Sequence, residues 1–314
     1  MRGTINWQVQ ELYKEVAAIG ESKHSAKTEA RSGGAATWHD VGQKLGVHSY
    51  STADEYRAVW RHVAEHARTE SGIKNMEKLT GEHVKSYLES KISDGVAAAT
   101  FASYASACEK LSVALDRYAV THETGKVYGF SKSISEARAQ AAGLEKFEGS
   151  RAYEKPAALV AAITDEQFKL AATLQYEGGA RMHEISQIKE SQLKGLRMDA
   201  VTGQQRGFIE VRGKGGKIRE ILVSPGAYNR LSGEIKSNAD QQFKINENIY
   251  GKAITVGALA SGQKAEGTHG LRWSYAQERH QEVQQAGLCY EEALSRISQE
   301  MGHERSDITE HYLK

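Results

Sequence analysis

Proline is rare in this sequence, and its scarcity limits the folds that are open to the chain. Only two of the 314 residues are proline, Pro156 and Pro225. A proline inside a helix removes a backbone hydrogen bond and breaks the helix, so this chain can form long uninterrupted helices. Apolar residues recur at steps of three and four over many stretches, which is the spacing of one helix face. We therefore expect a mainly α-helical chain.

One region departs from this spacing. Residues 207–211 and 218–223 are short runs that contain Ile and Val, and they flank a turn with the sequence GKGG at 213–216. Glycines permit the tight turn that joins two antiparallel strands. These runs predict a β-hairpin with Lys214 at its tip, and hence a small β-sheet in a mainly helical chain.

The length of the chain suggests two domains. We place the junction near residues 148–151 and expect an N-terminal α-helical domain over 1–148 and a second, mixed α/β domain over 149–314. Residues 20–37 are polar and rich in Gly, Ala and Ser, which predicts a flexible connection or a basic loop. In the first domain the apolar pattern predicts helices over 5–19, 51–67, 80–93, 97–120 and 134–146.

In the second domain Arg181 is expected at the start of a helix that continues through residue 188, after a sharp turn at two glycines. Residues 246–267 are Gly-rich and are expected to form a loop. A short last helix, capped by Ser306 or Asp307, would carry Tyr312. Further helices are expected over 155–163, 165–177, 226–245, 268–286 and 290–301.

The bulk properties exclude several classes of protein. The formal charge is +1 at pH 7, so composition alone does not indicate a nucleic-acid binder, and a DNA-binding surface, if present, must come from basic groups gathered on one face. The two cysteines, Cys108 and Cys289, lack the neighbours of a metal site and indicate reduced thiols inside a cell. The N-terminus lacks the apolar run of a signal peptide, and no stretch approaches 18 apolar residues. We expect a cytoplasmic protein without membrane contact.

The C-terminal part of the chain carries side chains of strong chemical interest. His269 and Arg272 are three residues apart, so on a helix they share one face and can point at one object. An arginine offers a planar fork of donors that suits a phosphate, and a histidine can donate or transfer protons there. His303 follows, and Tyr312 lies nine residues beyond it. A tyrosine hydroxyl can act as a nucleophile and form a covalent intermediate.

These residues resemble the C-terminal boxes of the tyrosine recombinases, also called phage integrases: an H-x-x-R motif, a Gly-His pair and a terminal tyrosine. Two further boxes of that family have counterparts upstream in the family's order. The stretch EGGARMHEI at 177–185 resembles the first arginine box, and VRGKGGK at 211–217 resembles the lysine hairpin. Because four boxes occur in the same order, the resemblance is far more specific than any single box.

The resemblance implies a role for each residue in breaking a DNA phosphodiester. Arg181 and Arg272 would clamp the phosphate, and His303 would add a third hydrogen bond. Tyr312 would attack the phosphorus and form a 3′-phosphotyrosine, while Lys214 would act as the general acid for the 5′-oxygen.

Two further residues would assist. His269 would help the proton transfer or hold the phosphate, and Glu184 matches an acidic position that supports the site from behind. Tyr290 is an alternative nucleophile, but only Tyr312 has the family's spacing from the second histidine.

The resemblance also implies the architecture and the partners. The first domain would be the core-binding domain, which clamps DNA, and the second the catalytic domain. Basic residues of the first domain that are candidate phosphate contacts, or else ordinary exposed charges, are Lys23, Lys27, Arg31, Arg57, Arg61, Lys85 and Lys110. We expect duplex DNA with a specific recombination site as substrate, and no cofactor and no metal ion.

The expected assembly is a homo-tetramer on DNA in the nucleoid, formed from free monomers or dimers. It would exchange strands in pairs through a Holliday junction, in the integration, excision or resolution of a mobile element. Accessory DNA-bending or directionality proteins are further candidate partners. Only two residues follow Tyr312, so protomers are expected to communicate without the C-terminal tail of many relatives, unless the natural chain continues beyond Lys314.

Three other functions fit part of the pattern. A type IB topoisomerase uses similar groups but relaxes supercoiled DNA without a partner site, so sequence preference and the need for two sites would separate it from a recombinase. A catalytically silent DNA-binding regulator with the same fold is expected to lack one of the catalytic side chains, whereas all are present here. A general helical scaffold protein would show no salt-dependent binding to DNA.

Overall fold

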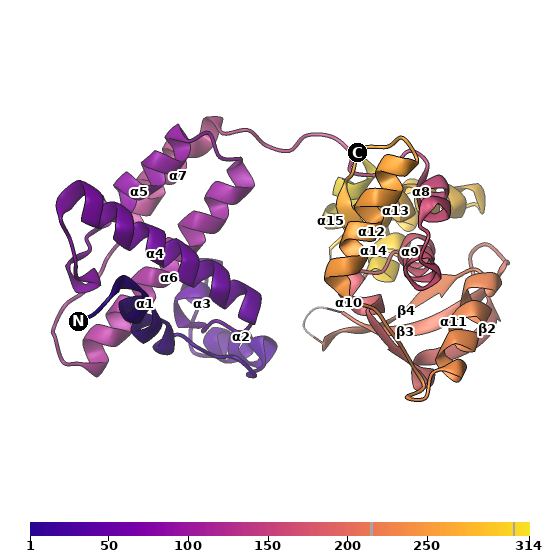
Figure 1. Ribbon diagram of the computed structural model, residues 1–314, viewed down its shortest axis with the longest axis horizontal. Coiled ribbons are helices and arrows are strands. Elements are labelled where there is room, and N and C mark those ends of the chain that lie inside the picture. Colours follow the sequence, from indigo (N-terminus) through magenta and orange to yellow (C-terminus); the bar gives the residue numbers. More distant parts are fainter. Residues whose placement is uncertain (214–215, 304) are drawn as a thin grey trace. The chain divides into compact units, whose positions relative to one another are not determined.

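The structure is a computed structural model that describes residues 1–213, 216–303 and 305–314. The chain divides into two compact units, residues 1–148 and 149–314, and each has its own hydrophobic core (Figure 1). Most of the described residues are helical, and the strands are confined to the second unit. The expected fold class, mainly α with a small β-sheet, is confirmed.

The first unit packs its helices around Trp60, which is fully buried and donates its indole N–H to the carbonyl of Ala107 at 2.7 Å. The predicted helices from residue 51 onward are all present, with ends that shift by a few residues. The helices are α1 (Ile5–Lys14), α2 (Lys23–Ser32), α3 (Trp38–Lys44), α4 (Tyr50–Ser71), α5 (Gly81–Ser93), α6 (Ala98–Thr121) and α7 (Ser131–Gln140).

The predicted loop over residues 20–37 is wrong, because most of this segment forms α2. Ser22 caps the helix by accepting a hydrogen bond from the backbone N–H of Ser25. Ala30 is buried in a small separate core with Ala35, Val41 and Leu45. The polar composition hid this helix, because one or two small apolar side chains are enough to pack it on α3.

The first helix is also shorter than its apolar pattern predicts, since α1 ends at Lys14 instead of residue 19. The backbone of Val16 and Ala18 pairs with Val47 in a short parallel bridge, at 2.7 and 3.0 Å, and so leaves the helix.

Lys110 does not serve the role expected of it. Its ammonium group is largely buried and donates to the carbonyls of Gly42 and Leu45 at 2.6 and 2.8 Å. Burial is the main cause that lowers the pKa of Lys110 to about 8. The residue therefore satisfies carbonyls at the C-terminal end of α3 and is not an exposed phosphate contact.

The second unit combines helices with two small antiparallel sheets. One sheet has the strand order β2-β3-β4, and the other pairs β1 with β5. The strands are β1 (Gln187–Lys189), β2 (Leu193–Met198), β3 (Gln205–Arg212), β4 (Ile218–Val223) and β5 (Gln242–Lys244). The helices are α8 (Pro156–Ala162), α9 (Glu166–Gly178), α10 (Met182–Ile185), α11 (Pro225–Ser237), α12 (Glu247–Ala260), α13 (Gly267–Gln285), α14 (Tyr290–Met301) and α15 (Ser306–Glu310).

The predicted hairpin is confirmed: β3 and β4 pair in antiparallel register, with Ile209 opposite Ile221. Helix α11 packs against β2 and β3, while α9 and α14 pack against β4 (Figure 1). The helix predicted from Arg181 to residue 188 ends early, because Gln187–Lys189 pairs with β5 instead. This pairing also shortens the helix predicted over 226–245, which ends at Ser237.

The loop predicted over 246–267 is wrong for most of its length, because residues 247–260 form α12. Asn246 caps the helix, and Tyr250, Ile254 and Ala258 are buried at four-residue steps. The loop was predicted because the segment is rich in glycine, but these glycines lie within or beside helices. A side chain at Gly257 would lie 3.1 Å from the carbonyl of Leu159, so this glycine lets α12 approach α8 closely.

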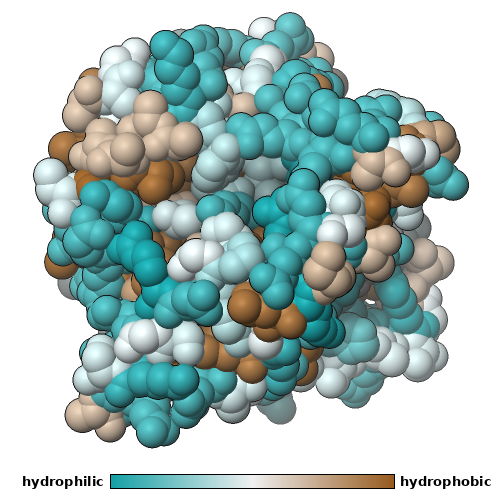
Figure 2. Space-filling view, turned by 90° about the vertical axis from the view of Figure 1, so that its right-hand side faces the viewer, coloured by the Kyte–Doolittle hydropathy of each residue, from teal (hydrophilic) through white to brown (hydrophobic). Residues whose placement is uncertain are grey.

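The molecular face in Figure 2 is largely hydrophilic, with apolar residues in small separate patches. Such scattered apolar side chains are normal on a soluble surface. Within the described residues, no helix is both long and apolar enough to cross a lipid bilayer.

Candidate active site

Tyr312 lies in a short 3₁₀ turn, His311–Leu313, directly after α15. Its side chain is nearly buried, and its hydroxyl lies 2.9 Å from Nε2 of His269 on α13. The rings of Trp273 and His303 pack against the Tyr312 ring, with centroids at 5.0 and 5.4 Å. Trp273 therefore packs the 3₁₀ turn that carries Tyr312 against α13.

Arg272 is completely buried on the same helix. Its guanidinium donates to the carbonyl of Gly179 and, at 2.5 Å, to the carbonyl of Met301. It also donates to Nε2 of His303 at 3.0 Å. Gly179 ends α9 with a positive φ of 58°, and a side chain there would collide with the ring of Tyr275. Gly179 thus lets the end of α9 approach α13 closely enough for Arg272 to reach its carbonyl.

Arg181 stands at the N-cap of α10 and forms a closed pair with Glu184. Its backbone N–H donates to Oε2 of Glu184 at 2.7 Å, and its guanidinium donates to Oε1 at 2.8 Å. Glu184 is buried, whereas the Arg181 side chain is one-third exposed. The Arg181 side chain is therefore more accessible to solvent than that of Arg272.

His303 has a defined tautomer. An arginine can only donate, so the contact from Arg272 requires an unprotonated Nε2. The ring proton must then lie on Nδ1, which donates to Oγ1 of Thr309 at 2.7 Å. Thr309 is fully buried and contacts the hydroxyl of Ser298 at 2.7 Å. The hydrogen bonds from His303 to Thr309 and from Ser298 to Thr309 form a hydroxyl relay. This relay connects His303 to α15, the helix that leads to Tyr312.

Burial and the nearby arginines lower the pKa of both histidines. Burial, followed by the charge of Arg272, lowers the pKa of His269 to about 4. Burial and then Arg272 and Arg181 lower the pKa of His303 to about 3. Burial, then Arg181 and Arg219, lowers the pKa of Arg272 to about 10. Strongly shifted pKa values of this kind are common at functional sites.

Lys214 lies outside the described residues, but the base of its hairpin is defined. The N–H of Gly213 donates to the carbonyl of Lys217 at 2.7 Å. A side chain added at Gly213 would lie 2.8 Å from Oε1 of Glu184 and 3.7 Å from the Arg181 guanidinium. The described base of the hairpin therefore meets the Arg181–Glu184 pair.

The predicted residues Arg181, Glu184, His269, Arg272, His303 and Tyr312 thus meet in one cluster within residues 149–314. Tyr290 begins α14 instead, where its ring contacts His280 at 5.0 Å. Among the described residues, no group of three or more His, Cys, Asp or Glu side chains could hold a metal ion.

No protein-family model and no curated protein sequence matches the chain. Solved structures do match. The XerH site-specific recombinase bound to difH substrate is 16% identical, with a TM-score of 0.62 over 98% of this chain and 92% of its own. A lambda integrase dimer bound to a COC′ core site is 16% identical, with a TM-score of 0.57 over 94% and 77%. The Tn1549 transposon integrase in complex with circular intermediate DNA is 12% identical, with a TM-score of 0.54 over 92% and 94%.

The chain has the tyrosine-recombinase fold. Two groups of residues at the site were not among those predicted from the sequence. Arg219 on β4 donates to Oε2 of Glu184 at 2.5 Å, and Thr309 and Ser298 orient His303. The position of Arg219, on the strand that follows Lys214, is the one feature of the sequence that could have pointed to it. No local pattern distinguishes Thr309 from other helix threonines.

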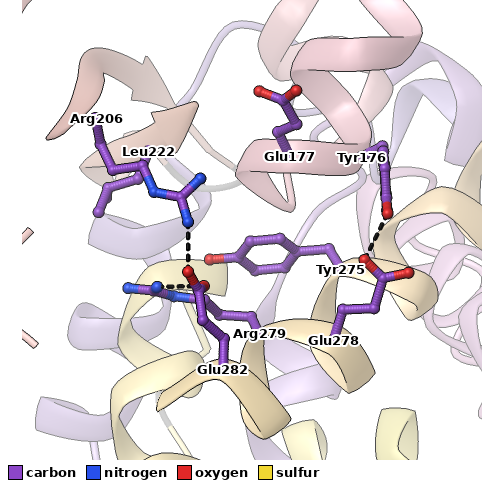
Figure 3. Close-up of a pocket in the computed structure, with 8 residues that line it drawn as sticks. All are labelled: Tyr176, Glu177, Arg206, Leu222, Tyr275, Glu278, Arg279 and Glu282. Atoms are coloured by element: carbon purple, nitrogen blue, oxygen red, sulfur yellow. Dashed lines mark hydrogen bonds and ion pairs between the residues drawn. The ribbon is translucent and has the colours of Figure 1, made fainter. Parts of the chain in front are cut away.

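The second unit also holds a polar cavity of about 370 Å³ between α9, α13 and the sheet (Figure 3). The hydroxyl of Tyr176 donates to Glu278 at 2.5 Å, and Arg206 and Arg279 both pair with Glu282. Among the described residues, none of the predicted catalytic side chains lines it, although Glu177 at the start of the first arginine box does. These pairings indicate a structural role, because the charges satisfy one another.

Proposed function

We propose that this chain is a site-specific tyrosine recombinase, an integrase of a mobile element, that cuts and rejoins duplex DNA through a 3′-phosphotyrosine. The observation that carries the proposal is the Tyr312 hydroxyl, 2.9 Å from His269 and packed against the Arg272–His303 pair. A nucleophile, a proton acceptor and fixed cationic donors are the groups that phosphodiester cleavage needs.

The electrostatics favour an anion. Three guanidinium groups, those of Arg181, Arg219 and Arg272, gather around one carboxylate, that of Glu184. A phosphate would offset this excess of positive charge, and the transition state gains further negative charge on its oxygens. The bound anion would also raise the pKa of His303, so that Nε2 gains a proton and donates to the phosphate instead of accepting from Arg272.

The chemistry proceeds in two transfers. His269, with its own proton on Nδ1, would accept the hydroxyl proton of Tyr312 at Nε2 as the tyrosine oxygen attacks the phosphorus. The bond from phosphorus to the 5′-oxygen breaks, and Lys214 would supply the proton for that oxygen, as the family resemblance implies. A 5′-hydroxyl from a second strand would then attack the phosphotyrosine and give its proton to Lys214, while the Tyr312 oxygen leaves and takes back its proton from His269. The phosphotyrosine keeps the bond energy, so no ATP is needed, and the arginines would supply the positive charge in place of a metal ion.

We propose that residues 149–314 form the catalytic domain and residues 1–148 a DNA-clamping domain. One feature of the first unit supports this role. Lys27 and Arg31 of α2 lie over the ring of Trp38, at 5.4 and 4.7 Å from its centre, and Trp38 is 68% exposed. Cations beside an exposed aromatic ring suit a nucleic-acid backbone and its bases.

We propose that four copies act on two DNA sites through a Holliday junction. The XerH, lambda and Tn1549 structures described above are complexes with DNA, which supports duplex DNA as the partner. A recombinase must pair two sites, whereas a topoisomerase would relax a single supercoiled plasmid.

The first prediction is that a covalent protein–DNA adduct forms and depends on Tyr312. Nicked duplexes tiled across the DNA that flanks this gene would be incubated with wild type, Tyr312→Phe and Tyr290→Phe, and adducts that survive denaturation would be measured. We expect adducts with wild type and Tyr290→Phe and none with Tyr312→Phe. An adduct that persists in Tyr312→Phe would refute the assignment of the nucleophile. Tight binding without any adduct would favour a silent regulator.

A further inference from the structure

Arg219 is a buried cation that the chemistry above does not use directly. It lies on β4, and its side chain is 7% exposed. One of its nitrogens, Nη2, donates to Glu184 at 2.5 Å, while Nε and Nη1 are buried without a partner among the described residues. Buried N–H groups without acceptors are costly, and apolar side chains often replace buried ion pairs without loss of stability. Stability alone therefore gives little reason for this arginine.

The carboxylate of Glu184 is shared between Arg219 and Arg181. Its Oε2 accepts from Arg219 and from the backbone N–H of Arg181, and its Oε1 accepts from the Arg181 guanidinium. A carboxylate with both oxygens engaged has a single orientation. Without Arg219, Glu184 would lose the partner that holds it from the side of the sheet.

Arg219 also contacts the turn that carries His303. Gly302 has a φ of 70°, and a side chain there would lie 2.8 Å from Nε of Arg219. Arg219 itself follows the hairpin whose base, at Gly213, lies against Glu184. The Arg219 guanidinium therefore meets both the Arg181–Glu184 pair and the turn that carries His303.

We infer that Arg219 is a positioning residue, which acts through Glu184 to hold the Arg181 fork in place relative to the lysine hairpin. The inference rests on the proposed function for its kinetic effect, but the contact itself can be tested without catalysis. Arg219 does not touch the phosphate, since its free nitrogens are inaccessible. Its loss would misplace a reacting group while leaving the DNA-binding surfaces intact.

The structural test is hydrogen exchange at the backbone N–H of Arg181, followed by NMR, in Arg219→Met and Arg219→Lys. We expect faster exchange in Arg219→Met, because Glu184 is released, and a smaller effect in Arg219→Lys, which keeps the charge. Arg206→Met is the matched control, because Arg206 is an ion-paired arginine of the same sheet that contacts Glu282 instead (Figure 3). Unchanged exchange in Arg219→Met would overturn the inference.

The kinetic test uses adduct formation on the wild-type target duplex. We expect Arg219→Met to slow adduct formation by roughly 10-fold to 100-fold, with DNA affinity unchanged within about twofold. In a Glu184→Gln background the same substitution should add little. Equal losses in both backgrounds would show that Arg219 does not act through Glu184. If wild type forms no adduct, the proposed function fails, and the exchange experiment alone decides the role of Arg219.

Discussion

At the residue scale, His303 shows how neighbours select the chemistry of a side chain. Arg272 donates to its Nε2, and Thr309 accepts from its Nδ1. The ring is thus oriented at both ends and neutral before any phosphate binds. Thr309 belongs to α15, so the orientation of His303 and the position of Tyr312 depend on the same short helix.

Replacing Thr309 by valine tests this relay, because valine keeps the shape and removes the hydroxyl. Nδ1 of His303 would lose its acceptor in a buried place, so we expect the free energy of unfolding to fall by about 1–3 kcal/mol. Adduct formation should fall as well. Urea unfolding measures the first effect, and Thr309→Ser, which retains the hydroxyl, should stay near wild type. A valine variant as stable as wild type would refute the relay.

At the scale of elements, α13 contributes side chains both to the candidate active site and to a buried charge cluster. Its first half carries His269 and Arg272, and its second half carries Arg279, which is buried in a charge cluster. Arg279 pairs with Asp199 at 2.8 Å and with Glu300 at 3.0 Å. Asp199 and Glu300 are themselves buried. The cluster ties α13 to α14 and to the turn after β2.

We predict that Arg279→Met destabilises the second unit by about 3–5 kcal/mol, because Asp199 and Glu300 lose their buried counter-charge and, among the described residues, keep only the partly exposed Arg296 as an ion-pair partner. Denaturant unfolding would measure the loss. Arg230→Met is the matched control, since Arg230 forms an exposed pair with Glu166 at 2.9 Å, and such pairs contribute under about 1 kcal/mol. Similar losses in both variants would show that burial of the cluster does not set its energy.

Local sequence signals predicted most helices and the hairpin, since apolar spacing and turn glycines act over a few residues. They failed for α2 and α12, whose polar or glycine-rich composition conceals small buried faces. They also failed where a strand paired with a distant segment, as at β1 and β5. Arg219 was missed for the same reason: its partner Glu184 lies 35 residues away, and no local pattern records that contact.

At the scale of the whole molecule, the two units have separate cores and need not unfold together. Acid should affect the second unit through its histidines. Their pKa values in the folded chain, about 4 for His269 and about 3 for His303, lie below the ordinary 6.5. The unfolded chain therefore binds protons first as the pH falls, and protonation favours unfolding.

We predict that the unfolding transition of the second unit moves to lower temperature as the pH falls from 7 towards 4. Calorimetry at several pH values would measure it. A variant with both His269→Gln and His303→Gln should show a smaller decline, because it lacks these two groups. An equal decline in the variant and the wild type would mean that other groups dominate.

The hydrogen bond between Tyr312 and His269 lies within a single chain. A site with its own tyrosine does not borrow one from a neighbour, so on the proposed chemistry each copy cuts the DNA strand that it holds. A defect in one copy would then be confined to one strand. Two damaged copies, one without the tyrosine and one without Arg272, would not complement each other. The number of DNA strands that are cut would therefore equal the number of intact copies on the DNA.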